Sequence, residues 1–275
     1  MNNKSKGFTL VELSIVIIII GFLIAGIAAG QSLIKQAKFN SVISDMQGFQ
    51  ASYNNFVSRY GEVPGDMTDA ESYWPTGGAT PCAATANLCN GDGNGLISFP
   101  ETGAAWKELA LAGMISGNIV PLPADWGLSW VEVPGVTTPV SKIDGGGYTM
   151  IGACHGTFGC TEGNIGNGPW SSSTPWIDDA TNAVFVAKPS TSDGLGAEVF
   201  TSADAFSIDQ KIDDGQIDSG GNFIGANTGK FQSTNGSGQA IFSGSCTVGS
   251  LFGGNLNIYK LTNTDVTCVS GWALN

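Results

Sequence analysis

The chain has 275 residues, 40 of them glycine, and a formal net charge of −12. This acidic balance disfavours nonspecific nucleic-acid binding, which depends on Lys and Arg side chains that neutralise phosphates. An enzyme is also disfavoured, because the sequence has no phosphate-cradling glycine loop, no Gly-x-Ser-x-Gly motif and a single histidine, His155.

A short basic leader precedes the first apolar segment. Lys4 and Lys6 come before Gly7, and residues 13–34 contain no charged side chain. This length suffices for one membrane-spanning helix, with the two lysines on its cytoplasmic side. A secretory signal peptide is disfavoured, because the small residue precedes the apolar run and no Ala-x-Ala site closes the run soon enough.

One carboxylate, Glu12, lies at the start of this apolar segment. A charged side chain near the bilayer centre costs about 2.5–3.5 kcal/mol on insertion scales, so Glu12 requires a partner or a function. An ordinary single-pass membrane anchor, which is the alternative interpretation, supplies neither.

Residues 6–13, KGFTLVEL, resemble the amino terminus of the type IV pilin superfamily, which includes pilus subunits, minor pilins and the pseudopilins of type II secretion. The resemblance implies that a prepilin peptidase cuts between Gly7 and Phe8 and methylates the new amino group of Phe8. It also implies that Glu12 pairs with the Phe8 amino group of a neighbouring subunit during filament assembly.

The helix is predicted to continue beyond the membrane. Apolar residues recur at steps of three and four up to Tyr60, which predicts one apolar stripe, and Gly61 followed by Pro64 ends the helix. A helix from about Thr9 to about Tyr60 is roughly 75–80 Å long. The stripe requires an apolar surface, for which we expect a sheet; its members are Phe39, Val42, Ile43, Met46, Phe49, Tyr53, Phe56 and Tyr60.

After the helix, Gly-, Ser-, Thr- and Asn-rich segments alternate with short apolar runs. We expect strands at 148–152, 183–187, 239–242 and 257–261, and a short amphipathic helix at 101–115. The predicted fold class is α+β, in which the long amino-terminal helix packs on an antiparallel sheet with loop-rich, disulfide-closed insertions. The predicted parts are a leader (1–7), the helix (8–60, with 8–34 in the membrane or filament core) and a globular head (61–275).

Six cysteines all lie beyond the apolar helix, and an even number predicts disulfides in an exported domain. Zinc binding is disfavoured, because no Cys-x-x-Cys pair occurs and His155 has no partner ligands. Six cysteines allow about 15 pairings, so the sequence leaves the connectivity open. Nearest-neighbour pairing is the simplest: Cys82–Cys89, Cys154–Cys160 and Cys246–Cys268, the last of which resembles the loop-closing bridge near the carboxyl terminus of many pilins.

Residues 90–101, NGDGNGLISFPE, match the calcium-loop template D-x-[DN]-x-[DN]-G-x5-E except at its first position, where Asn90 replaces Asp. Oxygens at alternate positions converge on one ion, and a glycine at the sixth position permits the sharp turn. The predicted ligands are the side chains of Asn90, Asp92, Asn94 and Glu101, the Leu96 carbonyl and a water on Ser98. With two anionic ligands we expect modest affinity, as in extracellular modules near millimolar calcium. The alternative is a polar turn before a helix.

Segments 63–66 and 106–115 add a resemblance to a group of large pilin-like proteins that carry such a loop. A second acidic cluster is a weaker candidate metal site, because its spacing fits no template and Lys211 is an alternative partner for one of its aspartates. Its members are Asp209, Asp213, Asp214 and Asp218, for which a structural turn is the alternative.

The sequence therefore predicts a structural subunit of a type IV pilus or pilus-like filament. It would lie in the inner membrane before assembly and in a periplasmic or extracellular filament afterwards. Its expected partners are identical or related subunits, the prepilin peptidase, the inner-membrane assembly machinery and the membrane. A type II secretion pseudopilin is the alternative, since Gly21, Gly26 and Gly30 stand where many pilus subunits carry a helix proline. A membrane-anchored surface-binding protein is less favoured.

Overall fold

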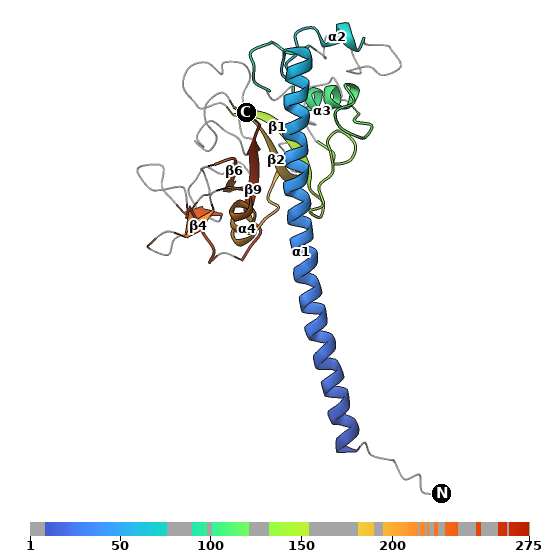
Figure 1. Cartoon of the computed structure of the whole chain (residues 1–275), viewed down its shortest axis with the longest axis vertical. Coiled ribbons are helices and arrows are strands. Elements are labelled where there is room, and N and C mark those ends of the chain that lie inside the picture. Colours follow the sequence, from blue (N-terminus) through green and yellow to red (C-terminus); the bar gives the residue numbers. More distant parts are fainter. Residues whose placement is uncertain are drawn as a thin grey trace, which may run out of the picture. The chain divides into compact units, whose positions relative to one another are not determined.

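The computed structural model describes residues 9–75, 90–97, 101–120, 132–153, 181–189, 195–213, 215–217, 219, 223–224, 229–235, 246–248, 258–262 and 264–274. The helices are α1 (Leu10–Tyr60), α2 (Ala70–Tyr73), α3 (Thr102–Leu111) and α4 (Ser202–Ile212) (Figure 1). The strands are β1 (Gly147–Ala153), β2 (Thr181–Pro189), β3 (Leu195–Ala197), β4 (Gln216–Ile217), β5 (Phe223–Ile224), β6 (Phe231–Asn235), β7 (Thr247–Val248), β8 (Ile258–Tyr259) and β9 (Cys268–Ala273). The chain divides into two compact units, residues 1–41 and 42–275, which are described separately.

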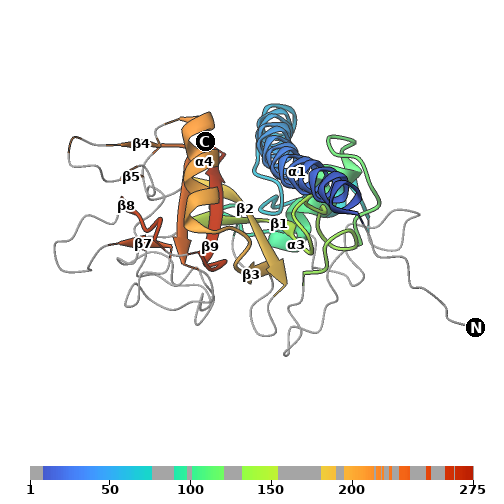
Figure 2. The same cartoon turned by 90° about the horizontal axis from the view of Figure 1, so that it is seen from below.

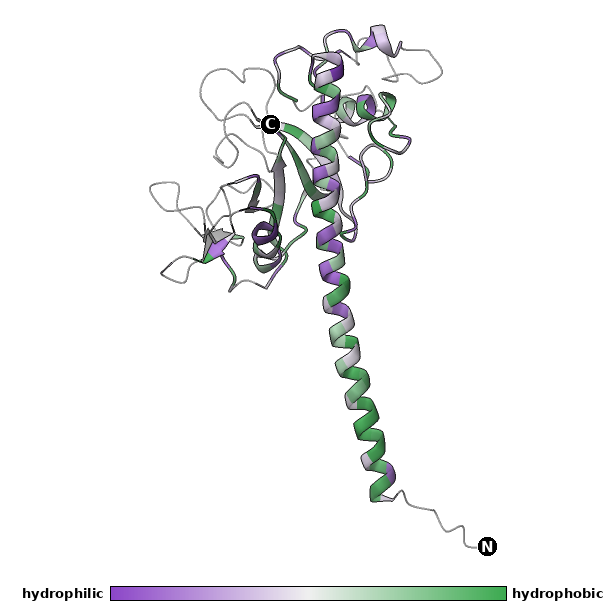
Figure 3. Cartoon of the chain, in the orientation of Figure 1, coloured by the Kyte–Doolittle hydropathy of each residue, from purple (hydrophilic) through white to green (hydrophobic). Residues whose placement is uncertain are grey.

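Helix α1 is continuous over 51 residues, as the sequence predicts. It ends at Gly61, whose φ of +78° is in the left-handed region and whose N–H donates to the Val57 carbonyl at 2.8 Å. In the view of Figure 3, the amino-terminal part of α1 is mostly hydrophobic, whereas polar residues interrupt the later part more often. The helix is long and apolar enough to cross a membrane, with a mean hydropathy of 2.8 over its most apolar window.

The part of α1 that belongs to the second unit packs through the predicted stripe. Val42, Met46 and Phe56 are fully buried. The Phe49 ring meets Tyr148 of β1 edge to face, with ring centroids 4.9 Å apart. Tyr148 also donates its hydroxyl to the Asp45 carboxylate at 2.9 Å, so apolar and polar contacts both fix the helix on the sheet.

The main sheet is antiparallel, with strand order β1-β2-β9-β6 and β3 paired to β2. This arrangement confirms the predicted fold class. Phe185 lies opposite Gly271 of β9, where a Cβ would come within 2.2 Å of the Phe185 ring, so the two strands require glycine at that position. Helix α4 lies beside β9 and β6 (Figure 2), and α3 contacts β1.

A smaller sheet has strand order β4-β5-β8-β7. Cys246, just before β7, forms a disulfide with Cys268 at the start of β9, which ties the smaller sheet to the main one. This bridge is one of the three predicted pairs. The other four cysteines, Cys82, Cys89, Cys154 and Cys160, lie outside the described residues, as does the predicted strand 239–242.

Helix α3 ends at Leu111, four residues before the predicted end at Ile115. Gly113 takes a left-handed φ of +72°, and Met114 donates its N–H to the Leu109 carbonyl at 2.9 Å. The helix therefore ends at a glycine cap. The predicted end was too late because the apolar pattern continues through Ile115 beyond this cap.

Candidate functional site

The start of helix α1 carries a reciprocal cap formed by Thr9 and Glu12. The Thr9 N–H and hydroxyl donate to the same oxygen of Glu12, Oε2, at 2.8 and 2.9 Å, and the Glu12 N–H donates to the Thr9 hydroxyl oxygen at 3.2 Å. This is the Ser/Thr-x-x-Glu capping box. This role of Thr9 was not predicted, although its spacing of three residues to Glu12 is a local sequence signal for such a cap. The predicted processing residues Gly7 and Phe8 lie outside the described residues.

The first turns of α1 expose large apolar side chains. Leu10, Ile17 and Phe22 are among them, and the Phe22 ring is 77% exposed. An apolar surface of this size requires lipid or other helices around it. The Glu12 carboxylate therefore lies at one end of a surface suited to a membrane or to a bundle of similar helices.

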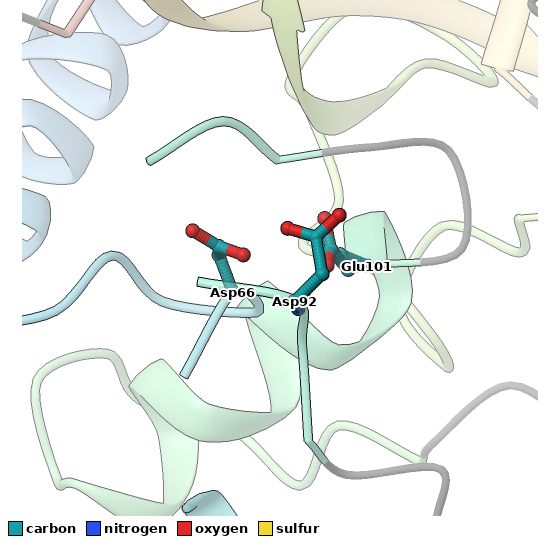
Figure 4. Close-up of side chains that lie close together, drawn as sticks. All are labelled: Asp66, Asp92 and Glu101. Atoms are coloured by element: carbon teal, nitrogen blue, oxygen red, sulfur yellow. Dashed lines mark hydrogen bonds between the residues drawn. The ribbon is translucent and has the colours of Figure 1, made fainter. Parts of the chain in front are cut away.

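The second candidate site is an acidic cluster in the head. One carboxylate oxygen from each of Asp66, Asp92 and Glu101 lies within 4.8 Å of the others. Figure 4 shows that the three side chains come from three separate segments of the chain. Asp92 and Glu101 are predicted calcium ligands that the fold brings together, whereas Asp66 was not predicted.

Asp66 is buried, with 2% of its surface exposed. Its Oδ1 accepts hydrogen bonds from the N–H groups of Gly93 at 2.7 Å and Asn94 at 3.3 Å, and its Oδ2 accepts one from Gly95 at 2.6 Å. Burial raises the pKa of Asp66 to about 6, the loop N–H groups oppose this shift, and the charge of Glu101 adds to it. The Asp66 carboxylate thus lies inside the turn of the predicted calcium loop.

The other predicted loop ligands differ in whether their side chains lie with the acidic cluster. Asn90 accepts a hydrogen bond from the Glu71 N–H of helix α2 at 3.0 Å. Asn94 donates its amide to Asp92 at 2.9 Å and accepts from the Leu96 N–H at 2.7 Å. The Leu96 carbonyl belongs to the described loop, while Ser98 lies outside the described residues. The structure therefore gathers Asp92, Asn94 and Glu101, whereas the side chain of Asn90 bonds to α2.

Two glycines allow the loop of residues 90–97, the turn that carries Asp66 and the start of helix α3 to approach one another closely. A Cβ on Gly91 would lie 2.3 Å from the Asp66 Cα, and a Cβ on Gly65 would lie 2.6 Å from the Glu101 carbonyl oxygen. Gly91 also donates its N–H to the Met67 carbonyl at 2.7 Å. The cluster consequently forms where three segments of the backbone are in direct contact.

Glu108 of helix α3 is fully buried and lies under the same turn. Its Oε2 accepts from the Gly65 N–H at 2.6 Å, while its Oε1 has no hydrogen-bond partner among the described residues. Burial raises the pKa of Glu108 well above its usual value, and the charges of Glu101, Asp66 and Glu62 raise it further.

The second acidic cluster is only partly described. Asp209 is buried in helix α4 and accepts a hydrogen bond from the Tyr259 hydroxyl at 3.0 Å. Asp213, which follows α4, accepts hydrogen bonds from the N–H groups of Lys230 and Phe231. Asp214 and Asp218 lie outside the described residues, so metal binding at this cluster stays a prediction.

Comparison with known proteins finds a family motif at the amino terminus. Residues 2–28 match the prokaryotic N-terminal methylation motif. A fimbrial protein of Neisseria meningitidis serogroup B is 38% identical over 71 residues, which is 26% of this chain and 42% of the fimbrial protein. No solved structure matches the chain. The motif and the relative confirm the predicted resemblance: the chain is type IV pilin-like.

Proposed function

We propose that the chain is a structural subunit of a type IV pilus or pilus-like filament and that it polymerises through helix α1. The observation that carries the proposal is the coincidence of a methylation motif and a single carboxylate at the start of one long apolar helix. The related fimbrial protein favours a pilus over the pseudopilus of a type II secretion system.

Assembly would follow cleavage between Gly7 and Phe8 by a prepilin peptidase, with methylation of the new amino group. The Phe8 ammonium of one subunit would then meet the Glu12 carboxylate of the next, so that neither charge is left unpaired in an apolar surrounding. Such a contact joins two different surfaces and generates an open helical filament. Inner-membrane machinery would supply subunits from the membrane to the growing filament at the cell surface.

The test compares Glu12→Ala with Ser14→Ala in cells that express the full chain. Ser14 lies one half-turn away, and its hydroxyl donates to the Val11 carbonyl of the same helix at 2.8 Å, so it is the matched control. We expect Ser14→Ala to assemble normally and Glu12→Ala to remain in the membrane, as measured by immunoblots of sheared filaments. Normal filament yield from Glu12→Ala would contradict the proposal.

The amount of the chain in sheared filaments distinguishes the two filament classes. A major pilus subunit is expected to be the most abundant protein in that fraction. Absence of the chain from sheared material, together with a secretion defect when its gene is deleted, would favour the pseudopilus.

Calcium is the proposed structural cofactor of the head, held by the loop of residues 90–101. Support comes from the template match in the sequence and from the meeting of Asp92 and Glu101 with a third carboxylate. Three carboxylates within 4.8 Å repel one another unless a proton or a cation lies among them. We expect chelation to lower the thermal midpoint of the full chain in detergent micelles. An equal midpoint with EDTA and with millimolar calcium would contradict the cofactor.

A further inference from the structure

The calcium-loop template leaves one position unexplained, namely its first ligand. The template requires Asp at this position, where the chain has Asn90. The Asn90 side-chain oxygen accepts the N–H of Glu71, which is one of the otherwise unpaired N–H groups in the first turn of α2. Asn90 therefore has a structural role that directs its oxygen toward α2.

Asp66 meets the two loop carboxylates from outside the template. Its carboxylate lies within 4.8 Å of both Asp92 and Glu101, and it accepts N–H groups from the middle of the loop. It reaches this position from a different segment, 24 residues before Asn90, because Gly91 allows the two backbones to touch.

An independent observation is a further buried carboxyl group, which lies beside the cluster. Glu108 is fully buried beside the turn that carries Asp66, and its Oε1 finds no partner among the described residues. Buried carboxyl groups are normally paired or bonded, so an excess of them beside a loop of calcium-binding sequence points to a cation.

We propose that Asp66 is an anionic ligand of the calcium site and takes the place of the template's first residue; the inference rests on the calcium site proposed above. The coordinating set then contains three anions, Asp66, Asp92 and Glu101, with further oxygens from Asn94 and the Leu96 carbonyl. Because affinity in these loops rises with ligand charge, calcium should bind more tightly than about 10⁻⁴ M, rather than near the millimolar value expected for two anions.

A ligand from the turn after α1 changes what the ion connects. A calcium ion held only by residues 90–101 would order one loop. With Asp66 as a ligand, the ion links that loop and the start of α3 to the turn that carries Asp66, six residues beyond the end of α1. The site thus becomes a cross-link between segments that are distant in the sequence.

The experiment measures calcium affinity by isothermal titration and the thermal midpoint by tryptophan fluorescence, using the full chain in detergent micelles. The variants are Asp66→Asn, which keeps an acceptor for the loop N–H groups, and Asn90→Ala. Glu62→Gln is the matched control. It removes one negative charge close to the same turn, but the Glu62 carboxylate accepts hydrogen bonds from Thr68 and is not part of the cluster. Magnesium replaces calcium in a parallel titration.

We expect Asp66→Asn to weaken calcium binding at least tenfold and to remove most of the calcium-dependent rise in midpoint. Asn90→Ala should leave the affinity within threefold of wild type and lower the midpoint equally with calcium and with EDTA. Glu62→Gln should bind calcium like wild type, and magnesium should compete weakly.

Wild-type affinity in Asp66→Asn would overturn the role of Asp66 and leave the calcium cofactor intact. Absence of calcium binding by the wild-type chain up to 10 mM would overturn both, without bearing on filament assembly. If Asp66→Asn fails to fold, Asn90→Asp decides: a tenfold gain in affinity would assign the ligand to position 90 and contradict the proposal. An unchanged or weakened affinity would support Asp66.

Discussion

The hydroxyl of Thr9 donates to the carboxylate of Glu12 and accepts the Glu12 N–H, so the two residues cap each other at the start of helix α1. The carboxylate that the pilin resemblance assigns to a neighbouring subunit is therefore already bonded within its own chain. A neighbour's ammonium would bring a full positive charge to the carboxylate, which the neutral Thr9 donors lack.

Thr9→Ala is expected to loosen the first turn of α1 by about 1 kcal/mol, the usual cost of removing a helix cap. Amide hydrogen exchange of the full chain in micelles would detect faster exchange at Val11 and Glu12. Ser14→Ala is the control, because its hydroxyl bonds a carbonyl within the helix. Equal protection in Thr9→Ala and wild type would show that the cap contributes nothing.

Phe49→Ala is expected to destabilise the head by about 2 kcal/mol, because a large, half-buried side chain leaves the interface between helix and sheet. The ring meets both Trp106 and Tyr148 edge to face, with centroids 4.9 Å away in each case. Thermal unfolding followed by tryptophan fluorescence measures the loss. Phe22→Ala, a change of the same type at an exposed position of the same helix, should leave the midpoint unchanged.

Replacing Cys246 and Cys268 together by alanine is expected to destabilise the head by about 3 kcal/mol. The bridge closes a loop with a sequence separation of 22 residues. A loop of that size lowers the conformational entropy of the unfolded chain, which stabilises the folded state by roughly 3 kcal/mol. Denaturant unfolding of the variant and of wild type measures the difference. Wild type without reductant should be the more stable, and equal midpoints would contradict the prediction.

Glu108→Gln is expected to stabilise the chain at neutral pH in the presence of EDTA. The pKa of Glu108 is raised in the folded state, so the folded chain holds a proton that the unfolded chain has lost. Stability of the wild type therefore falls as pH rises above the usual glutamate pKa, by up to about 1.4 kcal/mol per pH unit for one proton.

The difference between Glu108→Gln and wild type should vanish near pH 4, where Glu108 is protonated in both states. Urea unfolding at several pH values measures this difference and removes the contributions of other groups. A difference that does not change with pH would show that Glu108 is ionised in the folded chain.

Much of the helical framework could be predicted from the sequence, because its signals are local. The apolar periodicity and the glycine at position 61 predicted the extent of α1, and two apolar runs predicted β1 and the centre of β2. Strands β6 and β9 were missed. Their residues, FQSTN and CVSGWA, are polar or contain glycine, and they become strands because neighbouring strands pair with them.

The candidate cation site was predictable only in part, because only some of its residues belong to one local sequence pattern. Asp92 and Glu101 follow a template that is contained in 12 consecutive residues. Asp66 lies outside that window, and its place in the cluster depends on how the turn after α1 folds over the loop. No local spacing encodes such a contact, so the structure was needed to find it.

The last strand among the described residues, β9, lies in the interior of the main sheet, between β2 and β6. Both neighbours were synthesised earlier, yet neither can complete its ladder until residues 268–273 arrive. The main sheet therefore cannot finish folding while residues 268–273 are still being made or translocated. Folding has to follow delivery, and removal of residues 268–273 would separate β6 from the main sheet and open the edge of β2 that pairs with β9.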